Sequence, residues 1–193
     1  MSRKLAILAS ILLPLVPAHA ATKDGAFAVK EAGLARCQAY VDARTAKSEA
    51  IAHYMGWLAG YISAHNRHAA DTLDVAPWQS MSLLAALLEN YCKTNPDRSY
   101  GSAVGALVSE LASSRVRSRS ESVELTSEDK RVVVYGVILM RAQQVLSELG
   151  HYSGPIDGKP GPSTQEAISA YQKEKNLPVT GLPDQATLFS LFR

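Results

Sequence analysis

Thirteen consecutive residues near the carboxyl end, 150–162, hold four glycines and three prolines. Glycine permits positive φ angles and proline fixes φ, so this composition predicts a tightly specified loop. Apolar residues at helical spacing precede the loop and continue from Ala167 to Tyr171 after it. A second ordered turn is expected at 177–182, before a short last helix with Leu188 and Leu191 facing inward. We therefore predict three short helices joined by two structured loops.

The start of the first of these helices is less tightly specified. Residues 126–129, Thr-Ser-Glu-Asp, offer hydroxyl caps and acidic side chains for a first turn. The run 131–140 is rich in β-branched residues, which also suit a strand. We prefer a helix because Gln143, Leu146 and Leu149 continue the pattern to Gly150, a natural helix stop.

Many of these positions carry a resemblance to a known family. They are Gln143, Leu146, Leu149, Gly150, Tyr152, Gly154, Asp157, Gly158, Gly161, Thr164, Ala167, Tyr171, Gln172, the run 177–181, Ala186 and Thr187. Together they closely resemble the peptidoglycan-binding-domain-like family. The resemblance implies a three-helix module that binds the cell wall and is attached to another domain. Two departures are Tyr171, where phenylalanine is commoner, and His151 before Tyr152, where the family often joins glycine directly to tyrosine.

The resemblance leaves open which side chains touch peptidoglycan. Most matched glycines and leucines are expected to shape turns and fill the core. Aromatic rings and amides suit sugars and peptides, so the candidate binding residues are Tyr152, Asp157, Lys159, Tyr171 and Gln172. Asp157 has turn chemistry as its alternative role.

The first twenty residues have the layout of a secretory signal peptide. Arg3 and Lys4 precede an apolar run from Leu5 to Val16, and Ala18 and Ala20 flank His19 as a cleavage site. The apolar run is shorter than the ~20 residues of a membrane-spanning helix, and no cysteine for a lipid anchor follows it. We expect a periplasmic or wall-associated protein. Without these residues the charge balances, since two of the 20 basic residues and none of the 18 acidic ones are removed. A nucleic-acid partner is therefore not expected.

The remaining chain divides into two predicted domains. Residues 21–112 have helical apolar spacing that indicates four helices. Residues 113–125 alternate serine with charge and bury little, which predicts a flexible linker. Residues 126–193 make the second domain, so the predicted fold class is all-α.

The two cysteines, Cys37 and Cys92, are expected to form one disulfide in an oxidising compartment. Free buried thiols and a catalytic cysteine are the alternatives. These residues, with Tyr40, the 57–66 region and the Tyr91–Pro96 run, are similar to HdeA-type acid-stress chaperones and related secretion-system immunity proteins. That resemblance implies a disulfide-stapled helical module that binds proteins.

A catalytic or metal site is not expected. His65, His68 and Asp71 have ligand spacing on a continuous helix, but the stretch is polar and indicates a solvated helix end. Glu49 and Glu89 lack the paired context of a glycosidase. The favoured hypothesis is a wall-binding protein without cofactor or metal. A wall-tethered chaperone or inhibitor is the first alternative, and a peptidoglycan hydrolase is the second.

Overall fold

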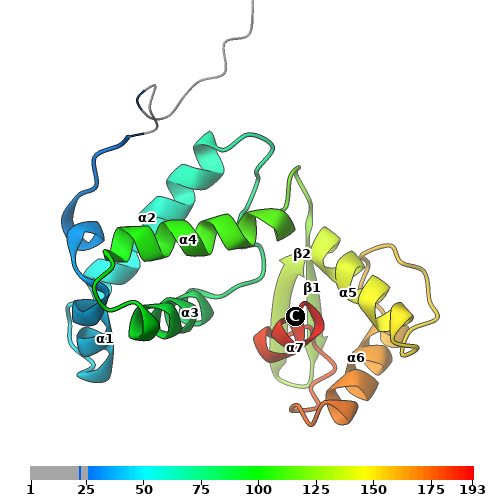
Figure 1. Cartoon of the computed structure of the whole chain (residues 1–193). Helices are drawn as coiled ribbons and strands as arrows, with labels where there is room; N and C mark the ends of the chain where they lie inside the picture. Colours follow the sequence, from blue (N-terminus) through cyan, green and yellow to red (C-terminus); the bar gives the residue numbers. More distant parts are fainter. Residues whose placement is uncertain (1–21, 23–25) are drawn as a thin grey trace, which may run out of the picture.

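The computed structural model describes Thr22 and residues 26–193. The predicted signal peptide, residues 1–20, lies outside the described residues. The chain forms a helical lobe followed by a second lobe that combines a hairpin with three helices (Figure 1). Each lobe has its own cluster of buried apolar side chains. Within the described residues, no helix is both long and apolar enough to cross a membrane.

The first lobe contains the four predicted helices. They are α1 (Cys37–Thr45), α2 (Ile51–His68), α3 (Met81–Thr94) and α4 (Tyr100–Leu111), preceded by a 3-10 turn, η1 (Glu31–Leu34). Ser80 and Ser99 cap α3 and α4 by accepting hydrogen bonds from backbone amides of the first turn. The predicted disulfide is confirmed, because Cys37 at the start of α1 bonds to Cys92 near the end of α3.

Three tyrosines fill the centre of this lobe. The rings of Tyr40, Tyr54 and Tyr100 lie with centroids 4.8–5.1 Å apart. The Tyr40 hydroxyl donates to the Ala85 carbonyl at 2.9 Å and the Tyr100 hydroxyl donates to the Tyr54 carbonyl at 3.1 Å. Buried phenols need such partners. Burial raises the pKa of Tyr40 to about 12, so these hydroxyls stay protonated at physiological pH.

The segment between the lobes is more ordered than a flexible linker. After a 3-10 turn, η2 (Ala112–Ser114), Val116 is buried and pairs with Asp74 in an isolated β-bridge. Further along, the Glu121 carbonyl accepts a hydrogen bond from the Gly136 amide at 2.8 Å. The expected linker boundary at residue 125 also falls inside a strand. The serines and arginines of this segment predicted that it would stay flexible. Its order comes instead from backbone hydrogen bonds and from the burial of Val116.

A β-hairpin opens the second lobe. Strands β1 (Ser122–Ser127) and β2 (Lys130–Tyr135) are antiparallel, with Leu125 opposite Val132 and Val123 opposite Val134. The preferred helix from residue 126 is therefore wrong for this part of the chain, and the strand alternative applies to 130–135. Leu125 and Val134 face the core while Val133 is exposed, the alternation of a half-buried strand. The protein is thus mostly helical with a small sheet, not all-α.

Three helices complete the second lobe. They are α5 (Gly136–Glu148), α6 (Pro162–Glu174) and α7 (Gln185–Leu191). Proline at the first position of α6 and Asp184 as the cap of α7 set two of the starts. Ile138, Leu146 and Ile168 are fully buried between the helices. The loops at 150–161 and 177–184 join the helices at the places that the glycines and prolines predicted.

Candidate functional site

The loop between α5 and α6 is held from inside by Gln143. The side-chain oxygen of this fully buried residue accepts hydrogen bonds from the backbone amides of Asp157 (3.1 Å) and Gly158 (2.8 Å). Its amide nitrogen donates to the Lys159 carbonyl and the Thr164 hydroxyl, both at 3.1 Å. A buried amide with its partners satisfied on both sides fixes the loop in one conformation.

Gln172 does the same for the loop between α6 and α7. Its side-chain oxygen accepts from the amides of Thr180 (2.8 Å) and Gly181 (2.9 Å). Its nitrogen donates to the Thr187 hydroxyl at 2.8 Å. Gln172 is fully buried, so the structure places this candidate binding residue in the core with its hydrogen bonds taken.

The two candidate tyrosines are also committed to the core. Tyr152 is 6% exposed and its hydroxyl donates to the Pro155 carbonyl at 2.9 Å. Tyr171 is 2% exposed and its hydroxyl lies 2.7 Å from the Ser190 hydroxyl. Neither ring presents a face to a ligand in this structure. Tyr152 thereby holds the loop between α5 and α6, and Tyr171 links α6 to α7.

Asp157 and Lys159 are the candidates that remain at the surface. The Asp157 carboxylate accepts from the Lys159 amide at 2.9 Å, a local turn that fits its alternative role. Both residues line a groove of about 550 Å³. Its other walls are the connecting segment 116–121 and the first turns of α5.

This groove, called the charged groove below, carries three uncommitted cations. Arg117, Arg119 and Lys159 line it and are exposed, and within the described part of the chain none forms an ion pair. Arg141 also lines the groove and donates to the carbonyls of Ser114 and Arg115. Sequence reasoning missed Arg117 and Arg119 because they lie in the presumed linker. The available signal was the cluster of arginines at 115, 117 and 119 in an otherwise balanced chain.

The wall that carries the two arginines is fixed at both ends. Val116 pairs with Asp74 at one end, and the Ser120 hydroxyl accepts from the Val137 amide at 3.2 Å at the other. A groove whose walls are held before binding loses less conformational entropy when a ligand arrives. The lining carries the carboxylates of Glu121 and Asp157 as well as the cations, so the groove can pair with groups of either charge.

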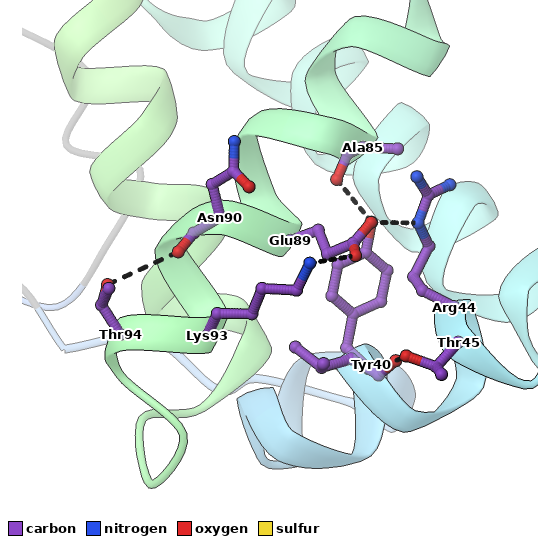
Figure 2. Close-up of polar contacts among 9 residues, drawn as sticks. Tyr40, Arg44, Thr45, Ala85, Glu89, Asn90, Lys93 and Thr94 are labelled. Atoms are coloured by element: carbon purple, nitrogen blue, oxygen red, sulfur yellow. Dashed lines mark hydrogen bonds and ion pairs between the residues drawn. The ribbon is translucent and has the colours of Figure 1, made fainter.

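The residues considered for catalysis lie in the first lobe. Glu89 bonds to Lys93 at 2.7 Å and Arg44 at 3.0 Å, which ties α1 to α3 (Figure 2). The hydrogen bond from Lys93 has the largest effect on the pKa of Glu89 and lowers it, and the hydrogen bond from Arg44 lowers it further. Glu49 is exposed. His65 and His68 end α2, and no group of three or more metal-ligating side chains occurs among the described residues.

Most of the second lobe matches a known protein family. Residues 138–191 match the family described as "Putative peptidoglycan binding domain". This part of the chain belongs to that family. The peptidoglycan-binding domain thus contains the two glutamine-held loops and the Asp157 and Lys159 wall of the charged groove. The arginine wall lies outside the matched residues.

Two relatives match a short stretch of the chain. The chain is 53% identical over 47 residues to the localization factor PodJL of Caulobacter vibrioides, a match that covers 24% of this chain and 5% of PodJL. It is 49% identical over 49 residues to the putative OxPP cycle protein OpcA of Synechococcus elongatus, covering 25% of this chain and 11% of OpcA. The chain therefore spans only a small part of either relative.

A solved structure also shows similarity. It is SltB3 from Pseudomonas aeruginosa in complex with NAG-anhNAM-pentapeptide, at 26% identity with a TM-score of 0.30. The alignment covers 54% of this chain and 26% of that chain. A TM-score this low supports no argument about the fold or function of the whole protein.

Proposed function

We propose that this protein is exported to the cell envelope, where its peptidoglycan-binding domain attaches it non-covalently to the wall and its first lobe is presented to a protein partner. The observation that carries the proposal is the family match over 138–191 together with the charged groove that this domain forms with the connecting segment. We propose binding without catalysis, because the candidate carboxylate Glu89 serves as a tie between helices.

Electrostatics supplies the recognition in this proposal. Stem peptides of peptidoglycan carry free carboxylates, and arginine pairs with carboxylates through two parallel hydrogen bonds. Arg117 and Arg119 line the charged groove from the connecting segment and Lys159 lines it from the loop between α5 and α6, together with the carboxylates of Glu121 and Asp157. A peptide lying in the groove meets cations from two segments of the chain. Because these side chains are exposed, added salt weakens their attraction to a ligand.

The disulfide supports the export part of the proposal. Cys37 and Cys92 are completely buried and bonded to each other. Structural disulfides persist in oxidising compartments and are rare in the cytosol. The sequence of the first twenty residues leads to the same compartment.

A wall-tethered chaperone or inhibitor is the second candidate. The first lobe exposes 62% of Phe27 and 66% of Leu34 near its amino end. Apolar side chains open to solvent on a disulfide-stapled helical lobe suit contact with another protein. Suppression of client aggregation by the full chain at acidic pH is the result expected if this lobe acts as a chaperone.

Sedimentation with purified sacculi tests the wall-binding proposal. A variant with Arg117→Ser, Arg119→Ser and Lys159→Ser removes the three groove cations. A matched control with Arg98→Ser, Lys130→Ser and Lys173→Ser removes the same charge from exposed positions outside the groove. We expect the groove variant to bind about tenfold more weakly at low salt and the control to bind like the parent. Equal loss in both variants, or none in either, contradicts the assignment of this groove.

A further inference from the structure

A second hollow lies beside the charged groove, where the two lobes meet. It has a volume of about 610 Å³, and its lining includes Trp78, from the loop before α3, and Phe192, from the end of the chain. The two rings lie edge to face with centroids 5.6 Å apart. We call it the aromatic hollow. Neither ring falls within the matched family residues, 138–191.

Contacts between the lobes hold Trp78 in this place. The amide of Ser80, two residues after Trp78, donates to the Gln185 side-chain oxygen at 2.6 Å. Trp78 also packs against the core of the second lobe, although it belongs to the first lobe in sequence. An aromatic ring of the first lobe therefore becomes part of the surface of the peptidoglycan-binding domain.

The aromatic hollow and the charged groove adjoin each other. Val137, Met140 and Arg141 of α5 line both. Met140 is 39% exposed and Ile156, which lines the aromatic hollow, is 40% exposed. The lining along α5 thus changes from charged residues in the groove to aromatic and apolar residues in the hollow.

We propose that the two hollows together bind one stretch of peptidoglycan, with sugar rings against Trp78 and Phe192 and stem-peptide carboxylates between Arg117, Arg119 and Lys159. This inference rests on the proposed function and adds which parts of the polymer are recognised. N-acetyl sugars have apolar C–H faces that stack on aromatic rings, and their amides need hydrogen-bond partners. The site is then composite, since the first lobe contributes Trp78 to it.

Polar groups at the rim favour a sugar over an apolar peptide. Gln144 on α5 has an exposed amide whose nitrogen donates to Glu148 at 2.7 Å, which leaves its second N–H for a ligand. Arg193 also lines the hollow and places its guanidinium 3.9 Å from the Phe189 ring centroid. The remaining amide N–H and the guanidinium donors match the acetamido and hydroxyl oxygens of a glycan. A wholly apolar partner segment would leave these donors without acceptors when it covered them.

Tryptophan fluorescence of the full chain tests this directly. The chain has two tryptophans, so Trp57→Phe leaves Trp78 as the reporter. We expect a saturable change in Trp78 emission on titration with tetra-N-acetylglucosamine. Trp78→Phe is expected to keep part of the affinity for this tetrasaccharide, measured by calorimetry, and Trp78→Ala to weaken it about tenfold. Because the emission of the Trp57→Phe chain is read with Trp78 intact, the test holds even if Trp78→Ala destabilises the fold.

The outcomes separate this inference from the proposed function. If sacculi bind the chain but the tetrasaccharide leaves Trp78 emission unchanged, the aromatic hollow is not a sugar site and the inference is overturned. A response to free stem peptide alone also overturns it. If sacculi do not bind the parent chain at all, the proposed function itself fails. A glycan response that survives removal of the three groove cations supports two adjoining subsites.

Discussion

Gln143 in α5 and Gln172 in α6 make equivalent hydrogen bonds to the loops that follow these two helices. Each side-chain oxygen accepts hydrogen bonds from two successive backbone amides, the second of which belongs to a glycine with positive φ. Each nitrogen donates to a threonine hydroxyl in the next helix, Thr164 or Thr187. The domain therefore repeats one helix–loop–helix device, and its stability depends on two buried amides.

Replacing Gln172 with alanine is expected to destabilise the second lobe by about 3 kcal/mol. The change leaves the amides of Thr180 and Gly181 without partners, and an unsatisfied buried group costs about 1–3 kcal/mol. Urea unfolding followed by circular dichroism measures the loss. Lys173→Ala, at the next and exposed position, is the control and should change stability by less than about 0.5 kcal/mol. Similar losses in both variants would contradict the structural role given to Gln172.

Two glycines with positive φ should differ in their tolerance of alanine. Gly150 has φ +80° with open space around it, whereas a Cβ at Gly158, φ +70°, would overlap the Gly136 carbonyl oxygen. We expect Gly150→Ala to cost about 1–2 kcal/mol from the backbone conformation alone. Gly158→Ala should cost clearly more, because the start of α5 must move. Thermal unfolding of the two variants side by side checks the order, and the reverse order would rule out this packing.

Removing the disulfide should weaken the first lobe. Cys37 and Cys92 are 55 positions apart, and closing a loop of that length stabilises the folded state by roughly 4 kcal/mol in the chain-entropy model. The double variant Cys37→Ala, Cys92→Ala is expected to unfold at lower denaturant concentration in the signal from the Tyr40, Tyr54 and Tyr100 cluster. The parent chain with reductant should behave in the same way. An unchanged midpoint would mean that helix packing alone sets the stability of this lobe.

Protonation of Glu89 in acid should make the first lobe less stable. Its pKa is lowered by hydrogen bonds from Lys93 and Arg44, so its contribution is complete above the pKa of the unfolded chain and is lost as pH falls through the lower, folded value. Denaturant unfolding at pH 7 and at about pH 3 measures this loss. Glu89→Gln should narrow the difference between the two pH values, whereas Glu49→Gln, at an exposed residue, should leave it as in the parent. If the free energy of unfolding depends on pH in the same way in the parent and in Glu89→Gln, the stabilising role given to the Glu89 ion pairs is contradicted.

The loops and the disulfide were predictable because their signals are local or exclusive. Gly158 and Gly181 adopt positive φ, a conformation that few other residues take, so the sequence reveals them. Two cysteines in a chain with a signal-peptide pattern leave one possible intrachain pairing. The number of helices in the first lobe also followed from apolar spacing, because the helical period is visible in consecutive residues. The first helix begins only at Cys37, and Leu34 before it is exposed.

The hairpin and the charged groove were not predictable in this way. The hairpin turns at Glu128 with φ +54°, and no glycine or asparagine marks the turn, while the residues around it look like a helix start. Arg117 and Arg119 become a groove wall only because Val116 pairs with Asp74, over forty positions earlier. Trp78 meets Phe192 across an even larger separation. Such contacts depend on how the two lobes pack together, and patterns among neighbouring residues carry no information about that packing.

Sedimentation with purified sacculi tests the central claim most directly when residues 22–193 are compared with a chain that ends at Ser120. The shorter chain keeps the four helices, the disulfide and the pairing of Val116 with Asp74, and circular dichroism checks that it is folded. We predict that the longer chain sediments with sacculi and is released by added salt, while the shorter chain stays in solution. Equal sedimentation of both chains would contradict the assignment of wall binding to the second lobe.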